Sequence, residues 1–598
     1  MRKWLARQLE PVDRSTRPVA VVIDPEDAVR TEDVDHLGEV AIARSSWELR
    51  RIFEAHGRHR SVDAPRLVLV VKATELQERR DLPWDIEQST AVAEVRVPGP
   101  PSLRDVVLGL ADDLSDRAAQ VLETTVDPPL TALLRAIWGV DPPNGQPVRE
   151  LDLVVRLRSD PRVPEAIWGL LHDQLLRWPP ARALCTDPPD AGPLQAAWAA
   201  WVQGREPSPV LDEMGPRIAP LFHLGLLQPV RGRREDLPGW ASVGIADTSP
   251  GERLEELLRS RPAPWPPTDL GDWHAVAEWW GEVRAARGEV NGGGLAEERI
   301  WAVWEELDAR FRPWLRENFG EILTRSSARP LTVDKVAPFL AARLRRGQAH
   351  RILLIVLDGM GLAQWSIIRR AAGLRVVDAS VVLALLPTIT SVSRQAIFSG
   401  SLPMLFPDSI GTTEREGEHW KRFWAREMPA LSEVSYARVS GAQPIPLGSA
   451  IVQGVVITAV DTMMHQAHLL GDVQLTASLV AWVRQGVLRS LVAQASRAGY
   501  EVWVTADHGN VEAVPIGSVA EGLKVEDAGQ RVRWYVNETL REASAAPGLR
   551  WTPPGIPDDC FLVFAEGRAA YVHGTAALVT HGGMSLDEVV VPLARVEA

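Results

Sequence analysis

The chain has 598 residues, a hydrophobic share of 45% and a formal net charge of −13 at pH 7. That length exceeds one ordinary domain and predicts roughly two to four domains. The acidic balance argues against a protein that coats nucleic acid through bulk charge.

The sequence shows neither a membrane-targeting segment nor a disulfide framework. Residues 1–11 lack the long apolar stretch of a secretory signal. No apolar run reaches the length of about 18 residues that a membrane span needs. Two cysteines, Cys185 and Cys560, are too few for a disulfide framework. We therefore expect a cytoplasmic protein without a membrane anchor.

Residues 1–127 alternate between apolar runs and helical patterns, which predicts a small N-terminal α/β (Rossmann-like) domain with a parallel sheet. The predicted strands are Val19–Ile23, Leu67–Val71 and Val92–Val97. Ser45 or Ser46 is placed to cap a helix that follows. Asp24, directly after the first strand, is interpreted as a turn-capping residue. A receiver-like role is disfavoured because no companion acidic pair or lysine stands out.

Residues 128–330 predict a helical domain whose helices are separated by proline-rich breaks. The chain contains 23 tryptophans, many of them in this segment. Pairs such as Trp301 and Trp304 have helical spacing. Packing between helices is the favoured interpretation, and stacking on nucleobases is the alternative.

Residues 345–598 predict a third domain, an α/β sandwich with its site residues on the loops that follow strands. Its apolar runs lie at 352–357, 376–384, 455–460, 502–505, 561–564 and 589–593. The last of these contains Pro592, which predicts an edge strand because proline donates no ladder hydrogen bond.

Three of these runs end in metal-ligand residue types. Asp358 follows the first run, and Asp461 follows the third, with His465 one helical turn later. Asp507 and His508 are adjacent after the fourth run. Carboxylates and imidazoles on strand-end loops can bind a divalent cation. The alternatives are a helix cap or turn for Asp358, and a helix cap for Asp461 with a core position for His465.

A helix start and a diglycine loop add to this set. Residues 387–400 read as a turn, a helix start and a glycine stop, so the Thr390 hydroxyl lies at a helix N-terminus, where phosphate can bind. Its alternative role is a helix cap. His581 precedes two glycines and is preferred over His573 as the last imidazole. Together these pieces predict a two-metal hydrolytic site, with ions about 3.5–4 Å apart and Thr390 as nucleophile.

The order of these motifs resembles that of the alkaline phosphatase superfamily and, more narrowly, of the PglZ family. The segments Leu-Pro-Thr-Ile-Thr-Ser-Val-Ser-Arg-Gln-Ala-Ile-Phe-Ser-Gly (386–400) and His-Gly-Gly-Met-Ser-Leu-Asp-Glu-Val-Val-Val-Pro-Leu (581–593) carry the resemblance. It covers residues 351–598 by motif, and the two preceding segments resemble the layout of full-length PglZ proteins less specifically.

The resemblance implies an alkaline-phosphatase-like fold and two divalent ions, zinc or alternatively manganese. One ion would be held by Asp358, Thr390, Asp507 and His508, and the other by Asp461, His465 and His581. It also implies a place in a bacterial phage-defence system of the BREX type, beside a DNA methyltransferase and ATPases. The phosphodiesterase branch follows its nucleophile with Phe-Pro-Asn-His, which this chain lacks, so Ser393 and Arg394 are the candidates for binding phosphate.

The expected function is therefore a metal-dependent phosphoesterase, acting as a phosphodiesterase on nucleotides or nucleic acid. The alternative from another class is a non-catalytic structural or regulatory subunit whose metal site stabilises the fold. A phosphatase or phosphopentomutase-like enzyme shares the same metal frame, whereas residues 387–394 lack the motif of a sulfatase. We expect residues 1–325 to dock partner proteins and a fragment of residues 345–598 to fold and carry the chemistry.

Overall fold

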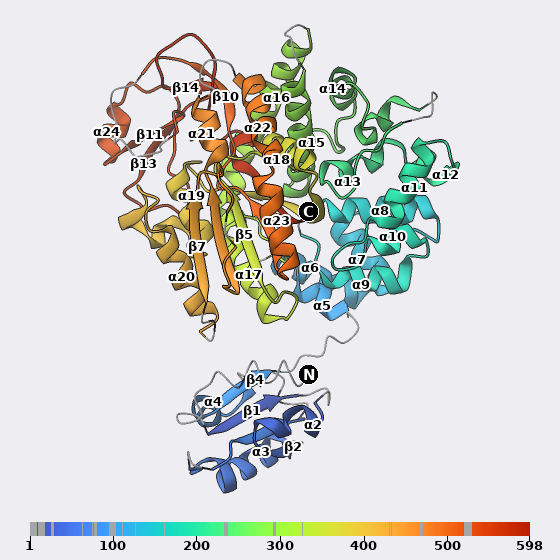
Figure 1. Cartoon of the computed structure of the whole chain (residues 1–598), viewed down its shortest axis with the longest axis vertical. Coiled ribbons are helices and arrows are strands. Elements are labelled where there is room, and N and C mark those ends of the chain that lie inside the picture. Colours follow the sequence, from blue (N-terminus) through green and yellow to red (C-terminus); the bar gives the residue numbers. More distant parts are fainter. Residues whose placement is uncertain are drawn as a thin grey trace. The chain divides into compact units, whose positions relative to one another are not determined.

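The computed structural model forms two compact units, Met1–Pro101 and Ser102–Ala598 (Figure 1). It describes residues 9, 18–24, 29–61, 64–73, 76, 81–94, 103–110, 112–125, 127–160, 162–232, 237–290, 295–325, 327–429, 431, 433–445, 447–466, 471–518 and 529–598. Within these ranges, no helix is both long enough and apolar enough to cross a membrane.

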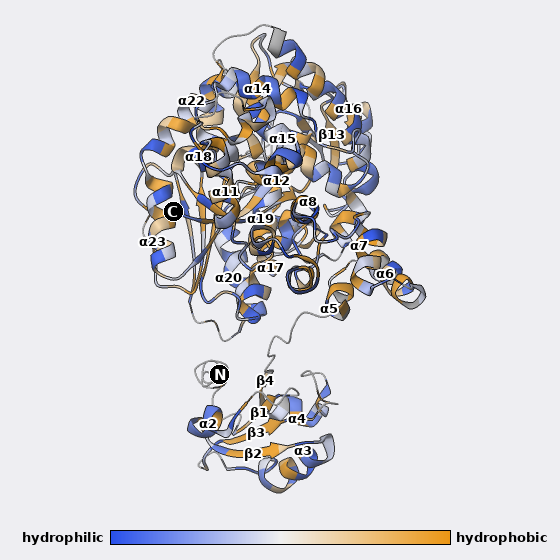
Figure 2. Cartoon of the chain, turned by 90° about the vertical axis from the view of Figure 1, so that its right-hand side faces the viewer, coloured by the Kyte–Doolittle hydropathy of each residue, from blue (hydrophilic) through white to orange (hydrophobic). Residues whose placement is uncertain are grey.

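The first unit is built on a parallel sheet with strand order β2-β3-β1-β4. Its strands are β1 (Val19–Ile23), β2 (Glu39–Ala43), β3 (Leu67–Val71) and β4 (Ala91–Glu94). The helices are α2 (Thr31–Val34), α3 (Ser46–Ile52) and α4 (Trp84–Ser89), with a π-helical turn at Phe53–Gly57. The hydrophobic strands are visible in Figure 2. The predicted parallel sheet is confirmed.

Details of this unit refine the predictions. Ser45 is the helix cap, because its side chain accepts from the Glu48 N–H at 3.1 Å. The edge strand β2 was missed because its side chains are mostly half-buried or exposed, which weakens the apolar signal. The strand predicted to reach residue 97 is described only as far as Glu94, and residues 95–97 lie outside the described ranges.

Asp24 is fully buried and accepts a hydrogen bond from the Val29 N–H at 2.8 Å, as expected of a turn-forming aspartate. The expectation that it lacks a companion lysine is wrong. Lys72 follows the neighbouring strand β3, and its Nζ lies 3.8 Å from Asp24 Oδ2. The two residues are far apart in sequence, but parallel strands bring their ends together.

The second unit begins with a long helical segment. Its helices are α5 (Leu103–Leu108), α6 (Asp112–Thr124), α7 (Pro129–Trp138), α8 (Pro147–Arg158), α9 (Ala166–Leu170), α10 (Pro179–Ala183), α11 (Gly192–Val202), α12 (Pro209–Met214), α13 (Ala219–His223), α14 (Pro250–Arg259), α15 (Leu270–Glu289), α16 (Leu295–Thr324) and α17 (Val336–Arg345). Short 3-10 or π-helical turns occur at Leu171–Leu175, Gly215–Ile218, Gly239–Gly244 and Val333–Lys335. The predicted helical character of the middle of the chain is confirmed.

A mixed sheet with strand order β6-β16-β9-β5-β8-β7 follows this helical segment. Its strands are β5 (Ile352–Leu357), β6 (Arg375–Leu383), β7 (Val434–Val439), β8 (Val452–Ile457), β9 (Glu501–Thr505) and β16 (Val590–Glu597). Strands β9, β5, β8 and β7 are parallel, whereas β16 is antiparallel to both of its neighbours. Figure 1 shows α19 (Thr390–Ser399) and α20 (Glu416–Glu427) on one side, and α18 (Leu362–Ala372), α22 (Gly471–Arg484) and α23 (Val487–Arg497) on the other. The α/β sandwich is thereby confirmed.

Shorter elements complete the second unit. They are α21 (Ala459–Gln466), α24 (Glu538–Ala543), α25 (Leu586–Val589), β10 (Val511–Pro515), β11 (Val532–Tyr535), β12 (Leu549–Arg550), β13 (Phe561–Phe564), β14 (Ala569–Ala570) and β15 (Leu578–Thr580), with 3-10 turns at Pro403–Leu405 and Pro407–Ser409. The short strands form two small sheets, β14-β10-β15 and β11-β13-β12. The predicted strand at 561–564 therefore lies outside the main sheet.

The last strand contradicts one prediction. β16 lies inside the main sheet, between β6 and β9, and is not an edge strand. Its pairing with β9 begins at Leu593, one residue after Pro592, so the missing N–H costs no hydrogen bond to β9. The Pro592 carbonyl instead accepts from the Thr505 hydroxyl at 2.7 Å. The proline is tolerated because the ladder to β9 starts after it.

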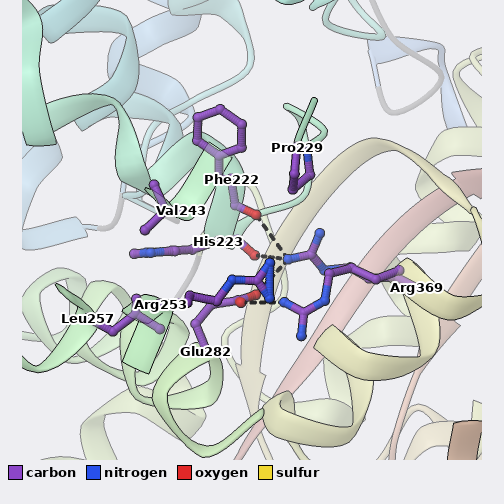
Figure 3. A pocket seen from close by; sticks show the side chains of 9 residues that line it. Phe222, His223, Pro229, Val243, Arg253, Leu257, Glu282 and Arg369 are labelled. Atoms are coloured by element: carbon purple, nitrogen blue, oxygen red, sulfur yellow. Dashed lines mark hydrogen bonds and ion pairs between the residues drawn. The ribbon is translucent and has the colours of Figure 1, made fainter. Parts of the chain in front are cut away.

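The helical segment and the main sheet share one hydrophobic core. Helix α15 packs on α18 and α22 and is buried along most of its length. Its tryptophans Trp279 and Trp280 are buried. They therefore pack between helices, as predicted, and do not form an exposed aromatic surface. Figure 3 shows one junction, where Arg369 of α18 donates to the carbonyl oxygens of Phe222 and His223 and to the carboxylate of Glu282.

Candidate metal centre

The candidate ligands gather because the strands that precede them are neighbours. β9, β5 and β8 run parallel, so their carboxyl ends meet at one edge of the sheet. Asp358 follows β5 directly, and Asp507 and His508 follow β9. Asp461 lies in the first turn of α21, which follows β8. The order of the strands thus brings motifs that are far apart in the sequence together in one site.

One group of potential ligands consists of Asp358, Asp507 and His508, whose ligand atoms all lie within 4.8 Å of one another. The backbone N–H groups of Gly359 and His508 both donate to Asp507 Oδ1 at 3.0 Å. Among the described residues, the buried oxygens Asp358 Oδ1 and Asp507 Oδ2 have no hydrogen-bond partner. Unpartnered buried carboxylate oxygens are costly unless a cation binds them.

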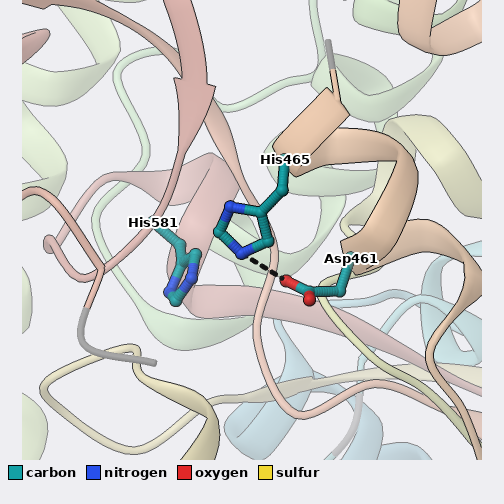
Figure 4. A group of neighbouring side chains, drawn as sticks. All are labelled: Asp461, His465 and His581. Atoms are coloured by element: carbon teal, nitrogen blue, oxygen red, sulfur yellow. Dashed lines mark ion pairs between the residues drawn. The ribbon is translucent and has the colours of Figure 1, made fainter. Parts of the chain in front are cut away.

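The other group consists of Asp461, His465 and His581 (Figure 4), again with ligand atoms within 4.8 Å of one another. His465 Nε2 lies 3.2 Å from Asp461 Oδ1. The His465 side chain is 48% exposed, whereas His581 is buried. His465 is therefore the ligand of this group that is most exposed to solvent. The alternative histidine, His573, is exposed and lies outside both groups.

Thr390 lies next to the first group at the start of α19. Its Oγ1 is 3.1 Å from His508 Nε2, and the rings of His508 and His581 are stacked at 4.1 Å. The Nδ1 of His508 faces the Gly509 carbonyl at 3.0 Å, and that of His581 faces the Thr388 carbonyl at 2.9 Å. These contacts assign the proton to Nδ1 and leave both Nε2 atoms free to accept or to ligate.

Three other hydroxyl groups near Thr390 differ in whether they form hydrogen bonds within the chain. Thr388 donates to the Gly583 carbonyl at 2.9 Å and so joins the α19 turn to the His581 loop. Ser393 exchanges hydrogen bonds with the backbone of Leu385. Ser391 Oγ is buried without a partner among the described residues. Ser393, a candidate for binding phosphate, is thus engaged by the chain itself.

Residues 334–596 match the family model described as the BREX system PglZ alkaline phosphatase-like domain. This part of the chain is a PglZ domain. It contains every candidate ligand and begins just before α17. Helices α5 to α16 of the helical segment, which share its core, lie outside the matched residues.

Several solved structures are similar to part of the chain at low identity. Murine ectonucleotide pyrophosphatase/phosphodiesterase 5 is 13% identical, with 41% of this chain and 88% of that chain covered and a TM-score of 0.29. The human protein of the same name is 12% identical, with coverages of 41% and 87% and a TM-score of 0.27. Phosphonoacetate hydrolase from Sinorhizobium meliloti 1021 is 11% identical, with coverages of 41% and 89% and a TM-score of 0.24. No curated protein matches the chain.

Arg394 is the main residue of the PglZ domain whose role the sequence did not reveal. Its buried guanidinium forms an ion pair with Asp358 Oδ2 and donates to Glu416 Oε1 at 2.5 Å. The Tyr436 hydroxyl donates to the other oxygen of Glu416. Arg394 stands four residues after Thr390, so helical spacing could have placed it on the same face. This second candidate for binding phosphate is therefore held by two carboxylates.

Hydrogen bonds of the Asn510 side chain connect the loop after β5 to the loop after β9. Gly359 has φ +72°, a left-handed conformation that glycine adopts without strain. Its carbonyl accepts from Asn510 Nδ2 at 2.8 Å, and Asn510 Oδ1 accepts from Gln364 Nε2 at 3.1 Å. Asn510 was not predicted, although it follows the Asp507-His508-Gly509 motif directly.

The protonation equilibria of the centre suit a cation site. Burial, with the nearby Asp507 charge, raises the pKa of Asp358, and Arg394 opposes this shift. Burial raises the pKa of Asp507 to about 6 and, together with His508, lowers the pKa of His581 to about 3. Divalent cations bind ionised carboxylates and neutral imidazoles. Burial lowers the pKa of His508 as well as that of His581, which favours neutral imidazoles, and a bound cation would stabilise the carboxylates as anions.

Proposed function

We propose that the PglZ domain hydrolyses phosphate esters at a centre of two divalent ions, with Thr390 as nucleophile. The observation that carries the proposal is the presence of two ligand groups, the first of them beside the Thr390 hydroxyl, with two buried carboxylate oxygens that have no hydrogen-bond partner among the described residues. Asp358, Asp507 and His508, with Thr390, would hold one ion. Asp461, His465 and His581 would hold the other.

Thr390 is proposed to attack phosphorus while the ester oxygen departs, which forms phosphothreonine that water then hydrolyses. When bound, the ions would lower the pKa of the Thr390 hydroxyl and offset negative charge on the phosphoryl oxygens. The early N–H groups of a helix have no intrahelical partner. The Ser391 N–H is therefore proposed to donate to a phosphoryl oxygen. Burial of Thr390 keeps the nucleophile away from bulk water.

The proposed substrate class is a phosphodiester in a nucleotide or nucleic acid, within a BREX-type defence system. The family match supports the setting, and the proposed partners are its DNA methyltransferase and ATPase. Zinc is the proposed metal because imidazole and carboxylate ligands suit it, with manganese as the alternative. The substrate is proposed to enter beside the exposed side chain of His465.

Paired assays test this proposal. Metal-depleted protein is reloaded with Zn²⁺ or Mn²⁺ and given bis(p-nitrophenyl) phosphate or p-nitrophenyl phosphate. We expect faster turnover of the diester, and Thr390→Ala should reduce it at least about 1,000-fold. The metal content of that variant should fall little, because the other ligands remain. Thr388→Ala tests the neighbouring hydroxyl, and full activity of Thr390→Ala would disprove the assigned nucleophile.

A non-catalytic role is the second candidate, and one observation favours it. Ser393 and Arg394, the candidates for binding phosphate, are both held by contacts within the chain. In this role the ions would only stabilise the fold. Two bound ions without turnover of either ester, together with a higher melting temperature of the loaded protein, would support it over the phosphoesterase.

A further inference from the structure

Asp587 connects the helical segment to the candidate metal centre. Its side chain is 8% exposed, and three donors from two helices surround its carboxylate. Trp280 Nε1 and Arg284 Nη1 of α15 donate to Oδ1 at 3.0 and 2.9 Å, and Trp304 Nε1 of α16 donates to Oδ2 at 2.8 Å. Charge-assisted hydrogen bonds in a buried setting are strong and directional. Both oxygens are thus held by residues outside the PglZ match.

The backbone of Asp587 in turn supports a candidate ligand loop. A Cβ atom added to Gly509 would lie 2.0 Å from the Asp587 carbonyl oxygen, so only glycine fits there. The Gly509 N–H donates to the Glu588 carbonyl at 2.8 Å. Gly509 directly follows the candidate ligands Asp507 and His508. A shift of residues 587–588 would therefore move the loop that carries them.

The same segment continues into the loop of His581. The Glu588 carboxylate accepts from the Gly583 N–H at 2.7 Å and from the Ser585 hydroxyl at 2.7 Å. Arg531 Nε donates to it at 3.0 Å. Residues 585–588 thus contact the loops that carry ligands proposed for both ions. The three donors to Asp587 tie this segment to α15 and α16.

We propose that Asp587 is a positioning residue. Through it, Trp280, Arg284 and Trp304 fix the position of the loop Asp507-His508-Gly509 relative to the loop of His581. The helical segment is then part of the support of the metal centre. Outer contacts of this kind set ligand orientation, and their loss typically reduces metal affinity about 10–100-fold. The effect on affinity rests on the proposed function, whereas the effect on loop order does not.

The test uses the full chain and starts without metal. Hydrogen–deuterium exchange is compared in wild type, Asp587→Asn, Trp280→Phe and the matched control Trp279→Phe. Trp279 is the adjacent buried tryptophan on α15, and its Nε1 donates to the Leu257 carbonyl at 2.8 Å, away from Asp587. We expect about tenfold faster exchange at 507–510 and 581–588 in the first two variants and no change there in the control.

A second measurement separates this inference from the proposed function. The proteins are titrated with Co²⁺, and the absorption spectrum reports ligand geometry. Asp587→Asn and Trp280→Phe should bind Co²⁺ about tenfold or more weakly with an altered spectrum, whereas Trp279→Phe should match wild type. Wild type that binds no Co²⁺ would defeat the metal assignment alone. Unchanged exchange in Asp587→Asn, or equal changes in the two tryptophan variants, would overturn the positioning role.

Discussion

At the residue scale, the two oxygens of Asp358 have contrasting surroundings. Oδ2 forms an ion pair with Arg394, while Oδ1 has no hydrogen-bond partner among the described residues. Arg394 is shared with Glu416, so one guanidinium compensates two buried carboxylates. Such an arrangement is stable only while the guanidinium is present, because each carboxylate would otherwise be buried without a counter-charge. Asp358 is thereby oriented before any metal binds.

Substitution of Arg394 should therefore be costly. Arg394→Gln leaves Asp358 and Glu416 without a guanidinium, and we expect the free energy of unfolding to fall by about 3–5 kcal/mol. Adding Glu416→Gln should restore part of that loss. Urea denaturation measures both effects. The control is Arg422→Gln, which removes an exposed pair with Glu418 and should cost less than about 1 kcal/mol. Equal losses in the two arginine variants would contradict this account.

At the element scale, α15 is a buried helix that carries charged residues. Glu282 is compensated by Arg369 and Arg370. Although burial opposes it, these arginines lower the pKa of Glu282. Burial raises the pKa of Glu278, one turn earlier, to about 8, and the charge of Arg369 opposes this shift. The same helix thus holds one ionised and one protonated glutamate at neutral pH.

We expect the contributions of Glu278 and Glu282 to folding stability to change in opposite directions with pH. The folded state binds the Glu278 proton more tightly than the unfolded state, so wild type loses stability as pH rises from about 4.5 to about 8. Glu278→Gln removes this loss, and its advantage should grow by on the order of 1.4 kcal/mol per pH unit across that window. Chemical denaturation at several pH values measures it.

Glu282→Gln is the matched comparison on α15. This substitution should lower the free energy of unfolding at neutral pH, and the difference from wild type should shrink as pH falls. The reason is that a lowered pKa of Glu282 stabilises the folded state fully only above the pKa of the unfolded glutamate, and this contribution is lost as pH falls below it. A pH-independent difference between Glu278→Gln and wild type would show that Glu278 is ionised in the folded protein.

At the scale of the whole molecule, the helical segment and the main sheet belong to one compact unit. Their buried side chains form one core, and α15 lies against α18 and α22. The sequence led us to expect that residues 345–598 fold alone and that residues 1–325 serve partner docking. The shared core leads to a different expectation for the fragment, because removing α15 and α16 exposes apolar surface and separates buried ion pairs such as Arg284–Asp472.

Two fragments test this expectation. Residues 102–598 should melt cooperatively and bind divalent ions as the full chain does, because this range is a compact unit. Residues 345–598 should show no cooperative thermal transition and little metal binding. Circular dichroism and elemental analysis give both readouts. A cooperative transition with bound metal in the shorter fragment would support the independent domain predicted from the sequence.

The sequence by itself determined the strand ends and the ligand types that follow them. Apolar runs before Asp358 and Asp507 predict buried strands, and parallel strands place their carboxyl ends at one edge by a general rule. Motif order then sufficed to predict the PglZ domain, and the helical spacing of Asp461 and His465 placed them together. These inferences depend on short segments and on periodicity, which the sequence displays directly.

Only the tertiary structure decided which distant segments support that site. The pairing of Arg394 with Glu416, the inner position of β16 and the three donors to Asp587 each depend on how separate elements pack. Asp587 lies 307 positions from Trp280 and 283 from Trp304. No local pattern encodes such partners, because a buried polar group is satisfied by whichever donor the fold brings within reach.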